Sequence, residues 1–189
     1  SSTAEKLSAG EILQIEKSIT RTMTEDVYFD MISQKTASLI ATSCELGAIT
    51  TTKSDQDRQA THLFGENLGM AFQIKDDLFD LMGSASDTGK NGGGDVKKNM
   101  MTLPLIYSKT HMTKSENRKL KELLGVKKKN RTVLAQIRGM IEETGGIDYA
   151  RKKLDEFSSH ALNAISIYPD SPVKQSLADL VAFNASRVK

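Results

Sequence analysis

Three aspartates stand close together near the middle of the chain, in residues 73–80, QIKDDLFD. A helix with about 100° per residue places Asp76, Asp77 and Asp80 on one face. Gln73 lies on the same face. Like charges three or four residues apart destabilise a helix, and the neighbouring positions on this face supply no lysine or arginine. The compensating positive charge must therefore come from elsewhere.

A divalent cation would supply that charge. Mg²⁺ takes oxygen ligands and typically uses one or two carboxylates, several waters and substrate phosphates. The acidic face therefore predicts Mg²⁺ bound together with a phosphorylated substrate. The alternative is an acidic helix end that simply faces solvent, although acidic residues near a helix C-terminus oppose the macrodipole. The residues alone leave both interpretations open, and we prefer metal binding.

Two lysines are candidates for contacts with an anion. Lys35 falls inside an apolar helix stripe, where an ammonium is costly to bury unless an anion meets it. Its ammonium either extends to solvent at the edge of the stripe or contacts an anion in a functional site. Lys90 follows Asp80 by ten residues in a glycine-rich segment, from which it could fold over an anion. That segment is no P-loop, because its glycines are too widely spaced and Asn91 replaces the required Ser or Thr.

The elements that must position these residues are helices, since helical periodicity recurs along the chain and strand-type alternation does not. We therefore expect an all-α fold. A capping box from Ser8 to Glu11 predicts the start of the first helix, which has an apolar stripe of Ile12, Ile15 and Ile19. Further helices are expected over residues 24–47, 55–81, 115–124, 132–143 and 147–167, with a last one starting at Ser171-Pro172.

The remaining segments carry weaker signals. The buried edge of the 24–47 helix is expected to consist of Tyr28, Ile32, Leu39 and Leu46. Residues 83–95 contain five glycines and are expected to form a loop. Residues 101–108 form an apolar segment with an early proline, and the basic run 127–129 is expected to be a solvated turn.

Composition excludes several classes of function. With 189 residues the chain fits a single domain, and its 26 basic and 24 acidic residues give a formal charge of only +2. We therefore expect no nucleic-acid partner. The sequence contains no stretch of roughly 20 apolar residues, so we predict no transmembrane segment. The one cysteine, Cys44, excludes an intrachain disulfide and favours a reducing compartment, so we expect a cytoplasmic protein. The histidines show no metal-ligand spacing.

Taken in order, these motifs resemble those of the trans-isoprenyl diphosphate synthase (polyprenyl synthetase) family over nearly the whole chain. Residues 72–80, FQIKDDLFD, are similar to its second aspartate-rich motif, F-Q-x-x-D-D-x-x-D. The other matching segments are Gly10-Glu11 with Gln14, Lys35-Thr36-Ala37, Gly89-Lys90, Gly94-Asp95, Thr102-Leu103-Pro104 and Arg187.

The resemblance implies an antiparallel helical array of the isoprenoid synthase type and a Mg²⁺-dependent prenyltransferase. In that reaction an allylic diphosphate ionises, and isopentenyl diphosphate attacks the resulting carbocation. By resemblance, the metal would be held or water-bridged by Asp76, Asp77 and Asp80. The allylic diphosphate would be contacted or oriented by Lys35, Thr36, Gln73 and Lys90. The residues with a catalytic role would be Lys35, Gln73 and Asp76. Family members are commonly homodimers, so a homodimer is expected.

Two features depart from the family pattern. Residues 99–101, NMM, stand where many members have G-K before x-T-L-P, and Lys97 or Lys98 is the alternative source of that lysine contact. A second D-D-x-x-D is absent from the sequence. We therefore expect residues 1–189 to be the C-terminal portion of a single all-helical domain. The family's N-terminal half would carry isopentenyl diphosphate binding and the determinants of product length, and this portion would be inactive without it.

Two other functions are compatible with the same helices. One is a related terpenoid cyclase on the same fold, which would not consume isopentenyl diphosphate. The other is a non-catalytic helical partner subunit of a prenyl synthase. The intact acidic face argues against the partner subunit, because a scaffold gains nothing from aspartates without neutralising charges.

Overall fold

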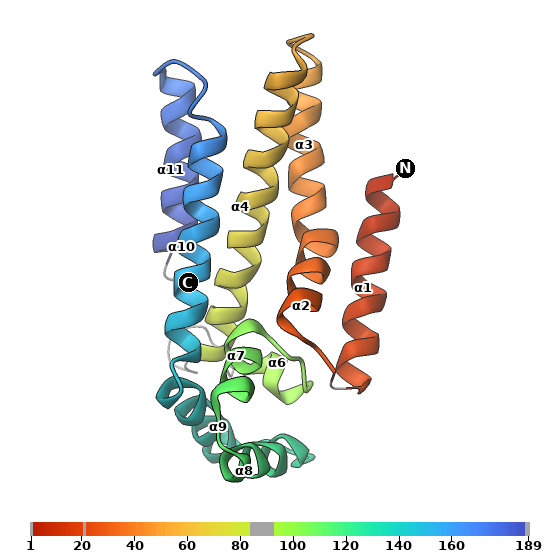
Figure 1. Ribbon diagram of the computed structural model, residues 1–189, viewed down its shortest axis with the longest axis vertical. Helices are drawn as coiled ribbons and strands as arrows, with labels where there is room; N and C mark the ends of the chain where they lie inside the picture. Colours follow the sequence, from red (N-terminus) through yellow and green to blue (C-terminus); the bar gives the residue numbers. More distant parts are fainter. Residues whose placement is uncertain (1, 21, 84–92, 188–189) are drawn as a thin grey trace. The chain divides into compact units, whose positions relative to one another are not determined.

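The computed structural model describes residues 2–20, 22–83 and 93–187, and these residues form helices and connecting segments without any strand (Figure 1). The all-α prediction is confirmed. None of the described helices is long and apolar enough to cross a lipid bilayer. The helices are α1 (Ser2–Thr20), α2 (Glu25–Ile32), α3 (Ser38–Ile49), α4 (Asp55–Met82), α6 (Gly94–Lys97), α7 (Leu103–His111), α8 (Lys114–Gly125), α9 (Arg131–Glu143), α10 (Gly146–Ala164) and α11 (Pro172–Ser186).

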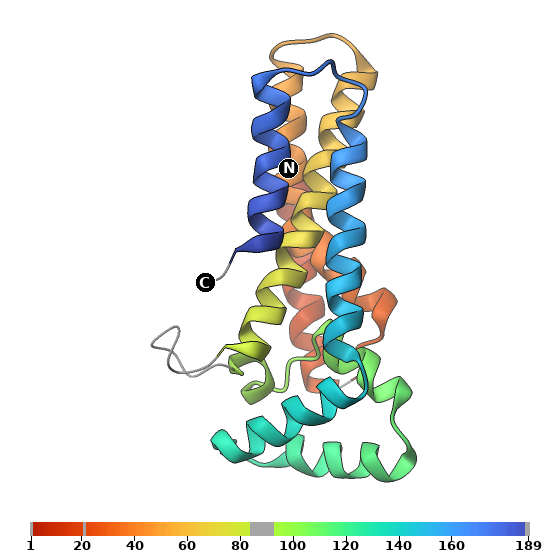
Figure 2. The ribbon, with the colours of Figure 1, turned by 90° about the vertical axis from the view of Figure 1, so that its left-hand side faces the viewer.

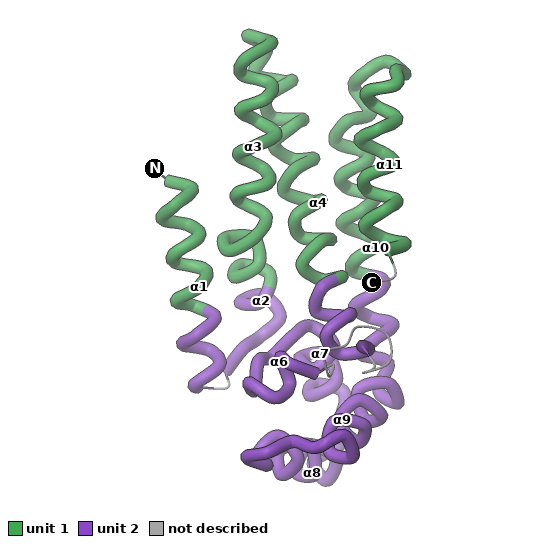
Figure 3. The backbone as a smooth tube through the Cα atoms, turned by 180° about the vertical axis from the view of Figure 1, so that it is seen from behind, with its two compact units in different colours: residues 1–13, 29–75, 153–188 green, residues 14–28, 76–152, 189 purple. Residues whose placement is uncertain are grey.

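The chain divides into two compact units (Figure 3). Unit 1 consists of Ser1–Leu13, Phe29–Lys75 and Lys153–Val188, and unit 2 consists of Gln14–Tyr28, Asp76–Lys152 and Lys189. Four helices, α1, α2, α4 and α10, begin in one unit and end in the other. The single domain expected from the sequence stays a prediction.

Unit 1 is built around an apolar cluster that joins three helices. Phe64 and Leu68 of α4 pack with Ala161 of α10, with Ile165 directly after α10 and with Val181 of α11, and all five side chains are buried. Figures 1 and 2 show α3 beside α4, and α11 beside the part of α10 that belongs to this unit. Cys44 is partly buried and packs against the edge of the cluster.

Helices α3 and α4 touch backbone to backbone because small residues face each other. A Cβ atom added to Gly69 would lie 2.5 Å from the Cα of Ala37, and one added to Gly65 would lie 2.8 Å from the Cα of Ala41. Such distances are far below van der Waals contact, so a larger residue at either glycine would force the helices apart. Glycine at position 69 therefore lets α4 approach the segment that carries Lys35.

A π-helical turn, Ser33–Ala37, interrupts the helix that the sequence predicts over 24–47. The start is confirmed, because α2 begins at Glu25 directly after Thr24, whose carbonyl accepts the amide of Tyr28 at 2.9 Å. Each π turn adds one residue to the winding, which rotates the following helix by about 100°. Lys35 and Thr36 both lie in this turn.

That rotation changes which residues are buried. Before the π turn, Tyr28 and Ile32 are buried as predicted, with exposed fractions of 0% and 1%. After it, Leu39 and Leu46 are 52% and 55% exposed, so this half of the predicted edge is wrong. Alanines take the buried positions of α3 in their place. When a helical periodicity of about 3.6 residues is continued across an unrecognised π turn, the buried face is assigned wrongly for all residues of the helix after that turn.

The first helix also differs from its prediction. It begins at Ser2, so Ser8 is an interior residue and caps nothing. The residues ahead of Ser8 include Ala, Glu, Lys and Leu, which are good helix formers and extend the helix. The apolar stripe Ile12, Ile15 and Ile19 exists but is exposed along α1. Gly10 is buried instead, because a Cβ there would lie 2.6 Å from the backbone nitrogen of Lys35.

Unit 2 contains α7, α8 and α9, and Figure 2 shows α8 and α9 side by side. Helix α8 begins with a capping box between Thr113 and Glu116, and α9 is capped by Asn130, whose side chain accepts the amide of Val133. Leu120 of α8 and Ile137 of α9 are buried. The predicted helices 115–124 and 132–143 are thus confirmed to within one residue at each end.

Two other predictions in unit 2 need correction. The expected loop 83–95 ends sooner, because α6 begins at Gly94, and residues 84–92 lie outside the described residues. Lys129 is only 9% exposed and donates to the Asn99 side chain at 3.0 Å. The basic run is therefore not wholly solvated, because its last lysine holds the turn against Asn99.

Candidate functional site

Helix α4 carries the acidic face, and it is continuous through all of the aspartates, as the sequence predicts. Asp77 is buried, with an exposed fraction of 7%, whereas Asp76 and Asp80 are half-buried. The boundary between the two units falls between Lys75 and Asp76. All three aspartates therefore belong to unit 2.

Tyr28 holds the buried aspartate. Its hydroxyl donates a hydrogen bond to the Oδ2 atom of Asp77 at 2.7 Å, and both residues lie in unit 2. Burial, followed by the negative charge of Asp77, raises the pKa of Tyr28 well above its ordinary value of 10.0. The hydroxyl therefore keeps its proton and acts as a lasting donor to the carboxylate.

Asp80 is held by backbone amides at the start of α6. Its Oδ1 atom accepts the amide of Gly94 at 3.0 Å, and its Oδ2 atom accepts the amide of Asp95 at 2.8 Å. Gly93 precedes them with φ of 78°, in the left-handed region that favours glycine, and its own amide donates to the Asp80 carbonyl at 2.6 Å. The Asp80 carboxylate thus anchors the end of the glycine-rich segment to α4.

The carboxylates on α4 are oxygen donors, the kind of ligand that Mg²⁺ takes. Among the described residues, no three His, Cys, Asp or Glu side chains converge on one point where they could enclose an ion. Mg²⁺ does not need such a cage, because waters and phosphate oxygens complete its octahedron. The carboxylates that could hold it are those of Asp76, Asp77 and Asp80.

In unit 1, three of the residues expected to contact a diphosphate have side-chain partners. The Thr36 hydroxyl donates to Oε1 of Gln73 at 2.8 Å, which joins the π turn to α4. The Lys35 ammonium lies 2.9 Å from Oε2 of Glu11 on α1, with side-chain exposures of 32% and 54%. Such an exposed ion pair is worth only about 0–1 kcal/mol. An anionic ligand could therefore replace Glu11 as the partner of Lys35 at little cost.

The end of α11 is fastened to α4 within unit 1. The Lys75 ammonium donates to the Ala185 carbonyl at 2.6 Å. Arg187 donates to the Phe72 carbonyl at 3.3 Å, and its guanidinium carbon lies 4.4 Å from the centre of the Phe72 ring. Arg187, which completes the sequence motifs, therefore contacts the residue directly before Gln73.

The structure gives less information on the other lysines that were expected to contact the substrate. Lys90 lies outside the described residues, so its role stays a prediction. Lys97 and Lys98, the alternatives for the missing lysine contact, are both exposed at the end of α6. Sequence reasoning missed the role of Tyr28, which lies 49 residues from Asp77. The only sequence signal at Tyr28 is its place in the apolar stripe of its helix. That stripe predicts that the side chain is buried, but it does not identify the residue that its hydroxyl contacts.

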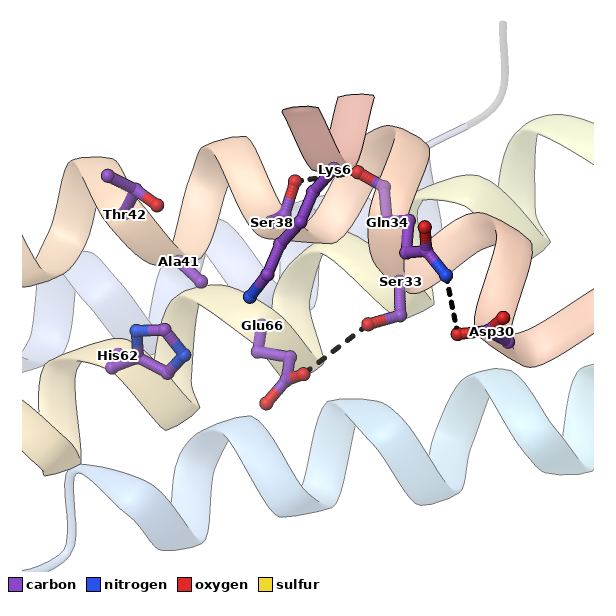
Figure 4. Close-up of a pocket in the computed structure, with 9 residues that line it drawn as sticks. All are labelled: Lys6, Asp30, Ser33, Gln34, Ser38, Ala41, Thr42, His62 and Glu66. Carbon is purple, nitrogen blue, oxygen red and sulfur yellow. Dashed lines mark hydrogen bonds between the residues drawn. The ribbon is translucent and has the colours of Figure 1, made fainter. Parts of the chain in front are cut away.

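Unit 1 also contains a polar pocket of about 280 Å³ (Figure 4), whose lining includes Ser33 and Gln34 of the π turn but none of the predicted site residues. Ser33 donates to Glu66 across it at 3.5 Å, and Gln34 donates to Asp30 at 2.7 Å. The Nδ1 atom of His62, another lining residue, lies 2.8 Å from Oε2 of Glu45. The lining carries charges of both signs, so it favours no single class of ligand.

Comparison with known proteins identifies the family. The Polyprenyl synthetase family profile matches residues 1–141. The all-trans-nonaprenyl-diphosphate synthase (geranyl-diphosphate specific) of Rhodobacter capsulatus is 32% identical over 184 residues, which are 97% of this chain and 56% of that protein. The octaprenyl diphosphate synthase of Escherichia coli is 26% identical over 96% of this chain and 56% of its own length.

Solved structures agree with the sequence match. A decaprenyl diphosphate synthase from Rhodobacter capsulatus superposes with a TM-score of 0.90 at 29% identity, covering 100% of this chain and 58% of that one. A polyprenyl synthase from Caulobacter crescentus, complexed with calcium and isoprenyl diphosphate, gives a TM-score of 0.89 at 28% identity, covering 98% and 56%. The chain belongs to the polyprenyl synthetase family, and it spans somewhat more than half the length of these relatives.

Proposed function

We propose that this chain is the part of a polyprenyl diphosphate synthase that binds Mg²⁺ and the diphosphate of the allylic substrate. The observation that carries the proposal is the acidic face of α4, where Asp77 and Asp80 are held in place by a hydroxyl and by backbone amides. Membership of the family supports the same conclusion. The reaction would be prenyl transfer from the allylic diphosphate to isopentenyl diphosphate.

The proposed role of the chain's own residues is to bind and orient the diphosphate. The Lys35 ammonium would exchange Glu11 for a diphosphate oxygen. Thr36 fixes the side-chain amide of Gln73 by donating its hydroxyl to the amide oxygen. Lys90 would add a second positive charge. When bound, Mg²⁺ supplies the charge that stabilises the departing diphosphate.

The chemical step follows from that charge arrangement. The carbon–oxygen bond of the allylic diphosphate breaks, and its electron pair leaves with the diphosphate. The double bond of isopentenyl diphosphate then attacks the carbocation, and a proton is lost to restore a double bond. Cations held next to the departing diphosphate would favour the negative charge that develops on it. In this scheme the catalytic residues are Lys35, Gln73 and Asp76.

The assembly and the location of the protein belong to the same proposal. The stripe Ile12, Ile15 and Ile19 along α1, with exposures of 65%, 54% and 76%, supports a homodimer, since such apolar surfaces usually mark an interface. A single cysteine supports a cytoplasmic location, where thiols stay reduced.

The test is calorimetric binding of inorganic pyrophosphate to the chain, with Mg²⁺ and with EDTA. We expect binding that depends on Mg²⁺ and that Asp76→Asn weakens by at least about tenfold, because metal affinity depends on the charge of the ligands. The matched control is Asp155→Asn, the same change on the exposed side of α10, which should bind like wild type. Binding that is equally strong in EDTA, or unchanged in Asp76→Asn, would contradict the proposal.

A further inference from the structure

The side chain of Tyr28 is the most completely buried polar group near the acidic face. None of its surface is exposed, and its hydroxyl lies 2.7 Å from Oδ2 of Asp77. A burial of this kind fixes the ring, so the direction of the hydroxyl is set by the packing of α2. The distance is typical of a well-formed O–H···O hydrogen bond. The tyrosine therefore holds one oxygen of the carboxylate in a defined position.

We propose that Tyr28 is a positioning residue for metal binding, which acts by orienting the Asp77 carboxylate. This inference rests on the proposed function, because it assumes that Asp77 binds Mg²⁺. A carboxylate has about four lone-pair positions on its two oxygens, so accepting one hydrogen bond still permits a metal contact. Groups that orient a metal ligand typically contribute 10- to 100-fold to metal affinity.

The surroundings of Asp77 explain why an orienting donor is useful there. Asp76 and Asp80 lie on the same helix face, and the charge of Asp95 also acts on Tyr28. A carboxylate among other carboxylates is repelled by them and would turn away if it were not held. Tyr28 supplies a neutral hydroxyl donor at 2.7 Å, so it holds Asp77 without adding a further charge that would compete with the metal.

Tyr28→Phe tests the inference, since it keeps the ring and removes only the donor. The matched control is Tyr149→Phe in the same unit, because the Tyr149 hydroxyl also donates to a carboxylate, Glu25, at 2.5 Å. The measurement is the Mg²⁺ concentration needed for half-maximal pyrophosphate binding. We expect Tyr28→Phe to raise it about 10- to 100-fold and Tyr149→Phe to leave it unchanged.

A double-mutant cycle separates positioning from a general loss of stability. If Tyr28 acts through Asp77, adding Tyr28→Phe to Asp77→Asn should change the Mg²⁺ requirement no further. Thermal unfolding of each variant shows whether the fold is kept. Should Tyr28→Phe fail to fold, the hydroxyl proton of Tyr28 in the wild-type chain can be followed by NMR, and we expect its resonance to shift when Mg²⁺ and pyrophosphate bind.

The outcomes also distinguish this inference from the proposed function. Wild-type chain that shows no Mg²⁺-dependent pyrophosphate binding would overturn the proposed function, and the inference with it. Wild-type binding together with an unchanged Mg²⁺ requirement in Tyr28→Phe would overturn the inference alone. An equal loss in Tyr28→Phe and Tyr149→Phe, or a Tyr28 resonance that does not move, would also overturn it.

Discussion

The carboxylates of Asp77, Asp80 and Glu116 accept hydrogen bonds from different kinds of donor. Asp77 accepts a buried tyrosine hydroxyl, and both oxygens of Asp80 accept backbone amides. These bonds restrict the direction of both carboxylates, as the proposed metal binding requires. Glu116 uses the same kind of contact for another purpose, since its Oε2 atom accepts the amide and the hydroxyl of Thr113 at the start of α8. There the bonds stabilise a helix end.

Glu116→Gln should change how stability depends on pH. The hydroxyl of Thr113, and then its amide, lower the pKa of Glu116 below its ordinary value of 4.5. A carboxylate with a lowered pKa stabilises the fold above 4.5, and that contribution is lost as the pH falls through the folded-state value. The stability difference between wild type and variant should therefore shrink in acid.

Urea unfolding of wild type and Glu116→Gln, from about pH 7 down to about pH 3, checks this expectation. Thr113→Ala removes the first of the two donors and should reduce the acid dependence only in part. Parallel stability curves for wild type and Glu116→Gln would show that the capping contact has no influence on the titration of Glu116.

Among the elements, the contact of α4 with the π turn leaves no room for a larger residue at position 69. Gly69→Ala would place a methyl group 2.5 Å from the Cα atom of Ala37, an approach that the backbone of the π turn cannot avoid by a side-chain movement. Overpacking of this kind should lower the free energy of unfolding by about 1–3 kcal/mol. Urea unfolding monitored by circular dichroism measures the change.

Gly47→Ala is the matched control for Gly69→Ala. Gly47 lies in α3, and nothing stands within 4 Å of the place where its Cβ would be. The same substitution should therefore raise stability by about 0.5–1 kcal/mol, because alanine favours a helix over glycine. Equal effects at the two positions would mean that the close approach of α3 and α4 does not constrain the fold.

Some features of the helices can be predicted from the sequence, and others depend on the tertiary fold. Most helix ends follow from local chemistry, as at Ser171, whose side chain accepts the amide of Lys174 and caps α11 before Pro172. The π turn has no comparable local signal. Because the sequence pattern was read as one continuous α-helix, it predicted that leucines face the core in α3, where alanines do. The acidic face was predictable because its spacing lies within one helix. The donor to Asp77 was not, since that pairing depends on the tertiary fold.

At the scale of the whole molecule, the exposed stripe of α1 predicts self-association. Burying a side chain such as Ile12 is worth about 1.5–3 kcal/mol, so Ile12→Asp should weaken a dimer at least about tenfold. Sedimentation velocity over a range of concentrations measures the effect. Val173→Asp is the control, because Val173 is 72% exposed but lies on α11. Equal association of wild type and Ile12→Asp would place the interface elsewhere.

The π turn has a further consequence for how this chain tolerates change in length. Deleting one residue from Ser33–Ala37 would allow ordinary α-helical winding to continue from α2 into α3. Helix α3 would then turn back by about 100°, swinging its alanines away from the glycines of α4 and bringing leucines toward them. A point substitution in this segment alters one side chain, whereas a single-residue deletion would present α4 with a different surface.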